Sequence, residues 1–146
     1  MRGSTGPPGS PRPSACRTYR SLLLTRPTTS LKRLYYEPEQ DDALVIELTG
    51  ETTLVFSSGT DWALQVDLVR GGQLPAWCWP VEDWTVRALP SPTPAALGTC
   101  REVIEQVNEV GEIVGARLVY GAGLIAIASG DWFTLTTEGF PQRPHG

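Results

Sequence analysis

Apolar and polar residues alternate along much of this chain from residue 30 onward. In the stretch ALVIELTGETTLVF, residues 43–56, two runs of alternating large apolar residues are separated by a Thr-Gly-Glu turn. A third run, WALQVDLV at residues 62–69, follows a Ser-Gly-Thr-Asp turn. A period of two is typical of a strand that buries one face, and the turns make successive strands antiparallel. The pattern therefore predicts an all-β protein.

The sequence contains this plan twice. The offset between matching apolar positions shrinks from 72 to 71 to 70 residues, losing one at each turn, in the pairs Ile46–Leu118, Leu54–Ile125 and Trp62–Trp132. We expect two repeated antiparallel four-stranded meanders, at about 30–69 and 100–138. A sheet with one apolar face must pack against another layer, so the two copies should form a single barrel or sandwich.

The segment 100–108 fits two different patterns. Cys100, Val103, Ile104 and Val107 also fit the i, i+3, i+4, i+7 spacing of a helix. The repeat favours a strand, and we predict a strand, with a helix as the alternative.

The motif Ser-Gly, an acid and then Trp occurs at equivalent positions in both copies. The favoured interpretation is structural: Ser-Gly makes a turn, the acid bonds turn amides, and Trp62 or Trp132 begins a strand and packs inward. In the remote alternative, Asp61 and Asp131 face each other as the paired carboxylates of a hydrolase or a cation site.

Before this pattern begins, the composition is different. Residues 1–27 are rich in Pro, Gly, Ser and Arg, which cannot bury enough apolar surface to offset the entropy of ordering, so we expect a disordered leader. An organellar transit peptide and a non-functional extension are its two interpretations. We expect one domain at 28–140 that folds without the leader, and a frayed tail at 141–146.

Charge divides the chain in the same way. Residues 1–36 carry seven of the 12 basic residues and no acid, which is +7, whereas the remainder carries five basic residues against all 16 acids, which is −11. An acidic body argues against nucleic acid as a partner and favours a basic protein. Three widely spaced cysteines predict a reducing compartment, and no apolar run is long enough to span a membrane, so we expect a cytoplasmic protein.

Catalytic residues are scarce. The only histidine, His145, is second from the end, which leaves no Ser-His-Asp or Cys-His system and no multi-histidine metal site. No glycine cluster has the form of a phosphate-binding loop. We therefore expect a protein with no catalytic residues, no metal and no cofactor.

The most distinctive candidate site is LPAWCWPVEDW, residues 74–84, on the long connection 70–99 between the repeats. Aromatic side chains are frequent in binding hot spots and sugar-stacking platforms, so Trp77, Trp79, Glu82 and Asp83 are the predicted binding residues. In the structural alternative the loop folds over an open end of the barrel and buries its rings.

The doubled meander, the stretch GEIVGARLVYGAGLIAIASGDW and the acidic body resemble small bacterial all-β proteins, including some immunity proteins that neutralise secreted toxins. The resemblance covers residues 30–138. It implies a non-catalytic protein-interaction module with a basic partner such as a toxin. The alternative is a carbohydrate or small-ligand binding domain that uses the Trp77 and Trp79 loop.

Overall fold

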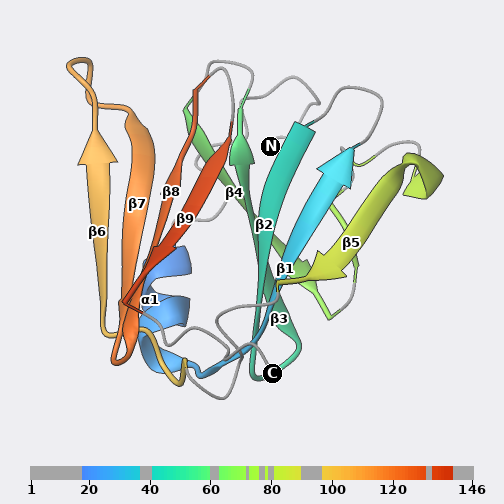
Figure 1. The fold of residues 1–146 in the computed structure, drawn as a ribbon, viewed down its shortest axis with the longest axis horizontal. Coiled ribbons are helices and arrows are strands. Elements are labelled where there is room, and N and C mark those ends of the chain that lie inside the picture. The colour runs from blue at the N-terminus through green and yellow to red at the C-terminus, as the bar shows by residue number, and fades with distance from the viewer. Residues whose placement is uncertain are drawn as a thin grey trace, which may run out of the picture.

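A computed structural model describes residues 18–36, 41–59, 63–71, 73–75, 78, 81–89, 97–130 and 133–139. Nine strands and a short helix are the main elements in this part of the chain (Figure 1). The helix is α1 (Tyr19–Thr25), and a single 3₁₀ turn, η2, covers Val81–Asp83. The strands are β1 (Thr28–Tyr36), β2 (Asp41–Leu48), β3 (Thr52–Ser58), β4 (Leu64–Arg70), β5 (Trp84–Ala88), β6 (Glu102–Val107), β7 (Ile113–Tyr120), β8 (Gly123–Ala128) and β9 (Thr134–Glu138).

The strands form two antiparallel sheets that face each other. One sheet has five strands in the order β4-β3-β2-β1-β5, and the other has four in the order β6-β7-β8-β9. The prediction of an all-β barrel or sandwich is confirmed in its sandwich form, because the described strands lie in two separate sheets and do not close into one barrel. The segment at 102–107 is a strand, as the repeat predicted.

Strand pairing confirms the repeat in the hairpins β2–β3 and β7–β8, whereas the last strands differ from the prediction, because Val66 and Leu135 occupy equivalent places at an offset of 69 and not 70. In the first copy Ile46 pairs with Leu54, and the offsets of 72 and 71 residues map this pair onto Leu118 and Ile125, which also pair. The same offsets map Leu44 and Phe56 onto Ala116 and Ile127, again a register pair. The two β-hairpins therefore share one register as well as one hydrophobic pattern.

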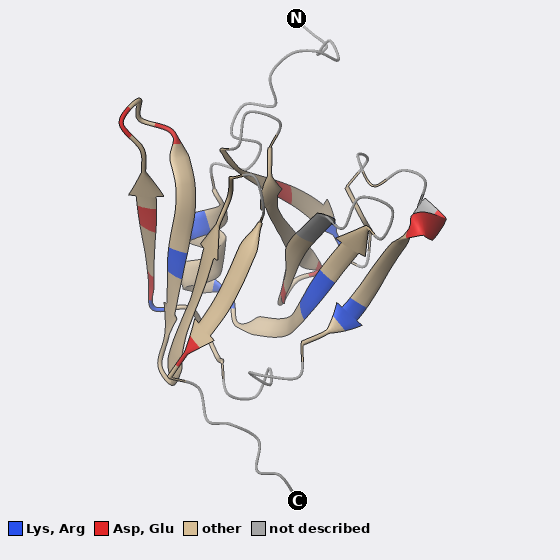
Figure 2. Cartoon of the chain, turned by 45° about the horizontal axis from the view of Figure 1, so that its top comes forward, with Lys and Arg blue, Asp and Glu red and all other residues tan. Residues whose placement is uncertain are grey.

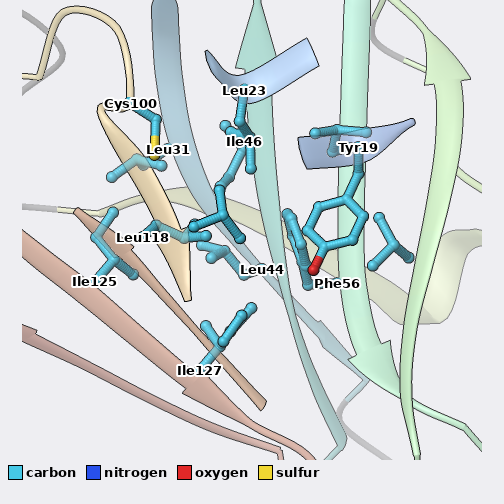
Figure 3. Close-up of a cluster of buried hydrophobic side chains, with 14 of the residues drawn as sticks. Tyr19, Leu23, Leu31, Leu44, Ile46, Phe56, Cys100, Leu118, Ile125 and Ile127 are labelled. Carbon is cyan, nitrogen blue, oxygen red and sulfur yellow. The ribbon is translucent and has the colours of Figure 1, made fainter. Parts of the chain in front are cut away.

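These paired positions form the core between the sheets. One cluster of buried side chains joins both copies (Figure 3), and its fully buried members contributed by the two hairpins are Leu44, Ile46, Leu54, Phe56, Ala116, Leu118, Ile125 and Ile127. Because side chains alternate across a strand, the apolar residues of each copy point to one face and meet those of the other copy.

Residues 18–27 correct the expectation of a disordered leader that extends to residue 27. They include α1, whose Tyr19 and Leu23 are one helical turn apart and both buried in the core. The Tyr19 ring lies edge-on to Phe56 with centroids 5.7 Å apart, and its hydroxyl donates a hydrogen bond to Glu105 Oε2 at 2.6 Å. A helix of seven residues is too short to give a recognisable helical pattern of apolar residues. The three consecutive leucines were its only sign in the sequence. Residues 1–17 and the tail from residue 140 lie outside the described part.

The connection between the repeats covers the outer face of the five-stranded sheet. A second cluster on that face contains the buried residues Leu34, Ala43, Val45, Val55 and Cys78, with Leu74 and Trp84 packed against them. Within the same connection β5 pairs with β1, and Trp84 stacks on Tyr36 with ring centroids 4.7 Å apart. The five-stranded sheet is therefore covered on both faces, which leaves the four-stranded sheet as the more open layer.

Candidate functional site

The predicted Trp-rich site is placed only in part. Trp77 and Trp79 lie outside the described residues. Glu82 is exposed and Asp83 partly exposed, and both belong to η2, which projects at the opposite side of the molecule from β6 (Figure 2). The described Cys78 between the two tryptophans is buried against the sheet. The loop thus covers the sheet where it can be followed, and its role as a binding surface stays a prediction.

The two Ser-Gly turns lie in contact with each other. The backbone N–H of Gly130 donates a hydrogen bond to Ser58 Oγ at 3.1 Å, which joins the second-copy turn to the first. The first turn is closed by a bond from Gly59 N to Ala63 O at 2.8 Å. These bonds support the structural interpretation of the repeated motif. Asp61, Trp62, Asp131 and Trp132 lie outside the described residues, so the paired-carboxylate and core-tryptophan predictions are untested.

Metal-ligating and nucleophilic side chains do not gather in the part of the chain that can be followed. No group of three or more His, Cys, Asp or Glu residues is placed there to hold a metal ion. Cys78 and Cys100 are free thiols, and both are buried. Burial, and secondarily the negative charge of Asp67, raises the pKa of Cys78 to about 12, and burial also raises the pKa of Cys100. Neither thiol is therefore an activated nucleophile.

We expect Cys78 and Cys100 to react with a thiol reagent only after unfolding, and the free energy of unfolding to fall above about pH 9. Unfolded thiols ionise near 8.5, whereas the folded thiols stay protonated to higher pH, so alkali favours the unfolded state. The loss should continue to about pH 12, the folded pKa of Cys78. Urea unfolding at several pH values measures it, and Cys78→Ala should flatten the decline. Native-state labelling as fast as that of a free thiol would contradict the assignment.

A polar hollow near the β2–β3 turn is lined in part by side chains that already have hydrogen-bond or ion-pair partners. It has a volume of about 240 Å³ and is lined by Thr29, Glu47 and Thr53, among others. The Thr29 hydroxyl donates to Glu47 O at 3.1 Å and the Thr53 hydroxyl donates to Gly71 O. The Glu47 carboxylate is paired with Lys32 Nζ at 3.3 Å. The hydrogen bonds and the ion pair of these side chains are made within the protein, so we do not take the hollow as a candidate binding site.

The turn between β6 and β7, residues 108–112, is organised by one side chain, and we call it the Asn108 turn. Asn108 Oδ1 accepts hydrogen bonds from the N–H groups of Val110 (3.0 Å) and Glu112 (2.9 Å), and its Nδ2 donates to Glu112 Oε1 (3.2 Å). Backbone bonds from Asn108 N to Glu112 O and from Gly111 N to Asn108 O close the same turn. Gly111 has a φ of 87°, which glycine adopts without strain. The turn is therefore held in one conformation.

The Asn108 turn exposes the apolar side chain of Val110 between two acidic residues. Val110 is 77% exposed, the highest value among the large apolar side chains that are described. Three of the six exposed large apolar residues in the described part lie between residues 104 and 110, namely Ile104, Val107 and Val110. Glu109 and Glu112 are exposed beside them, and no Lys or Arg occurs between Arg101 and Arg117 (Figure 2). Scattered apolar residues are normal on a surface, whereas a cluster marks an interaction site.

The binding residues predicted from the sequence did not include residues 109–112, which directly follow the strand expected at 100–108. The sequence contained one indication of this site, namely a valine between two glutamates in a turn. Such a valine has no neighbouring strand residue that could bury it. Its exposure depends on how far the hairpin projects beyond the sandwich, which is a property of the fold (Figure 1).

No helix in the described residues is long and apolar enough to cross a membrane. Comparison with known proteins assigns no relative: no family model, no curated protein and no solved structure matches this chain.

Proposed function

We propose that this protein is a small non-catalytic binding module, of the kind that immunity proteins represent, and that it binds a basic protein through the Asn108 turn. The observation that carries the proposal is the pair of exposed valines, Val107 and Val110, three residues apart in sequence and beside the exposed Glu109 and Glu112. An apolar centre with a charged rim is the usual composition of a protein-binding surface.

Each part of the turn contributes differently to binding. Val110 supplies apolar area that a partner would remove from water. Glu109 and Glu112 attract a basic partner during its approach and select against acidic ones. The hydrogen bonds of Asn108 fix the turn before binding, so little conformational entropy is lost when the complex forms.

We place this binding in a reducing compartment such as the bacterial cytoplasm. Support comes from the two described cysteines, Cys78 and Cys100, which are free thiols. In oxidising compartments, small domains more often join their cysteines in disulfides.

The proposal is tested by photo-crosslinking in cells from benzoylphenylalanine placed at position 110. We expect a crosslinked protein with a net positive charge, whose binding weakens as salt is raised. The double variant Glu109→Lys, Glu112→Lys should weaken binding by on the order of a hundredfold, because like charges then meet across the interface.

Leu68 is the matched control, because it is 50% exposed and lies on β4 in the other sheet. Benzoylphenylalanine at position 68 should not capture the same protein. Equal capture from both positions, or a partner indifferent to the charge reversal, would overturn the assignment of the site.

A further inference from the structure

Strand β6 is an open edge of the four-stranded sheet. It pairs only with β7 among the described strands, and no described element lies beyond it in either view (Figures 1 and 2). An open edge presents a row of backbone N–H and C=O groups that can pair with another strand. Natural proteins protect such edges with Lys, Pro, other charges or β-bulges. Strand β6, with the sequence EVIEQV, has no Lys or Pro, its Glu105 points to the core face, and its register irregularity lies at the end of the strand, between Gln106 and Val107.

The polar side chains of β6 leave this edge uncovered. On the core face, Glu105 Oε2 accepts the hydrogen bond of Tyr19, and Glu105 Oε1 lies 4.0 Å from Arg20 Nη1. On the outer face, the Gln106 side chain lies back over Gly115 of β7. The apolar Ile104 also lies on the outer face and is 43% exposed.

We infer that a second copy of this chain occupies the edge, with the two β6 strands antiparallel about a two-fold axis through Ile104. The two four-stranded sheets then become one continuous sheet. The paired segment is 102–106, so the Asn108 turn lies outside it, and the inference does not depend on the proposed function.

The register follows from the side chains. A two-fold axis perpendicular to the sheet places the outer faces of the two copies on the same side. The side chains of two paired residues must therefore lie on the same face of the sheet. Centring on Ile104 places Ile104 against its own copy and Glu102 opposite the uncharged Gln106. Centring on Glu105 would place two carboxylates opposite each other, which is unfavourable. Centring on Val103 would shorten the overlap within β6 and lose the pairing of Ile104 with its own copy.

Charge at the ends of β6 also favours the antiparallel arrangement. Arg101 stands at its beginning, whereas Glu109 and Glu112 follow its end. Antiparallel pairing brings Arg101, which directly precedes Glu102 at the beginning of β6, toward the acidic end of the other copy. A parallel arrangement would place acid beside acid.

The first test is the mass of the full chain in solution, measured by sedimentation equilibrium over a range of concentrations. We expect association from 15.9 kDa to twice that mass. Ile104→Lys should weaken dimerisation by on the order of a hundredfold, because two ammonium groups then meet on the axis. Val86 on the β5 edge is 41% exposed, so Val86→Lys is the matched control and should leave the dimer intact. Thermal melting of both variants checks that they fold.

The second test fixes the register by disulfide formation in a Cys16→Ser background. Cα atoms of directly opposed residues are about 4.5–5.5 Å apart, within disulfide range, so Ile104→Cys should crosslink two chains on oxidation. Gln106→Cys should not, because its copy would lie about 13 Å away along the strand. A single-chain mass at every concentration, or a dimer sensitive to Val86→Lys and not to Ile104→Lys, would overturn the inference.

Discussion

Replacing Leu23 with alanine should destabilise the protein by about 2–5 kcal/mol, because it leaves a cavity in the core. Leu23 is 0% exposed and belongs to the cluster that joins both sheets (Figure 3). A chain that begins at Thr28 loses Tyr19 as well and should be less stable still. This replaces the expectation, made from the sequence, that the domain folds equally well without residues 1–27.

The adjacent Leu24 provides the control. It is chemically identical, lies in the same helix and is 38% exposed, so Leu24→Ala should change the free energy of unfolding by well under half as much. Urea denaturation of both variants gives the comparison. Equal effects at the two positions would show that α1 does not pack as described.

Replacing Phe56 with alanine should cost about 3–5 kcal/mol, the usual range for a buried aromatic ring. Phe56 is 0% exposed on β3, pairs with both Leu44 and Val66, and packs edge-to-face with the Tyr19 ring. This cost is a large share of the stability of a domain of this size. The variant should therefore melt at a much lower temperature, or fail to fold at physiological temperature.

Leu68→Ala on the neighbouring β4 is the control, because Leu68 is half exposed and should cost little. A double-mutant cycle between Tyr19 and Phe56 isolates their contact and should give a coupling of about 0.5–1.5 kcal/mol. A coupling near zero would contradict the edge-to-face packing that links α1 to the sandwich.

Helix α1 also connects the core with the open strand. Tyr19 contacts Phe56 through its ring and Glu105 of β6 through its hydroxyl. The helix therefore holds the core face of β6 in place while the outer edge of the strand stays free. Loss of α1 should for this reason disturb the edge and the Asn108 turn as well as the core.

The candidate site was accessible to sequence analysis only in part. The acids Glu109 and Glu112 and the valine between them are visible in the sequence, and they fit the predicted basic partner. Sequence analysis favoured the tryptophan loop instead, because aromatic residues are common in binding sites. The described part of that loop proved to cover a sheet, since Val45 and Val55 are apolar on the face opposite the core and need a cover.

The sequence by itself determined the strands, their order in each hairpin and the duplication. Alternation with a period of two is a local property, so Ile46 could be matched with Leu118, and Leu54 with Ile125, without coordinates. Tertiary structure alone decided that Leu23 is buried while Leu24 is exposed, which sheet face the connection covers, and that β6 remains an open edge. Burial of these residues depends on contacts between segments far apart in the chain, as between Tyr19 and Phe56, and no local pattern records such contacts.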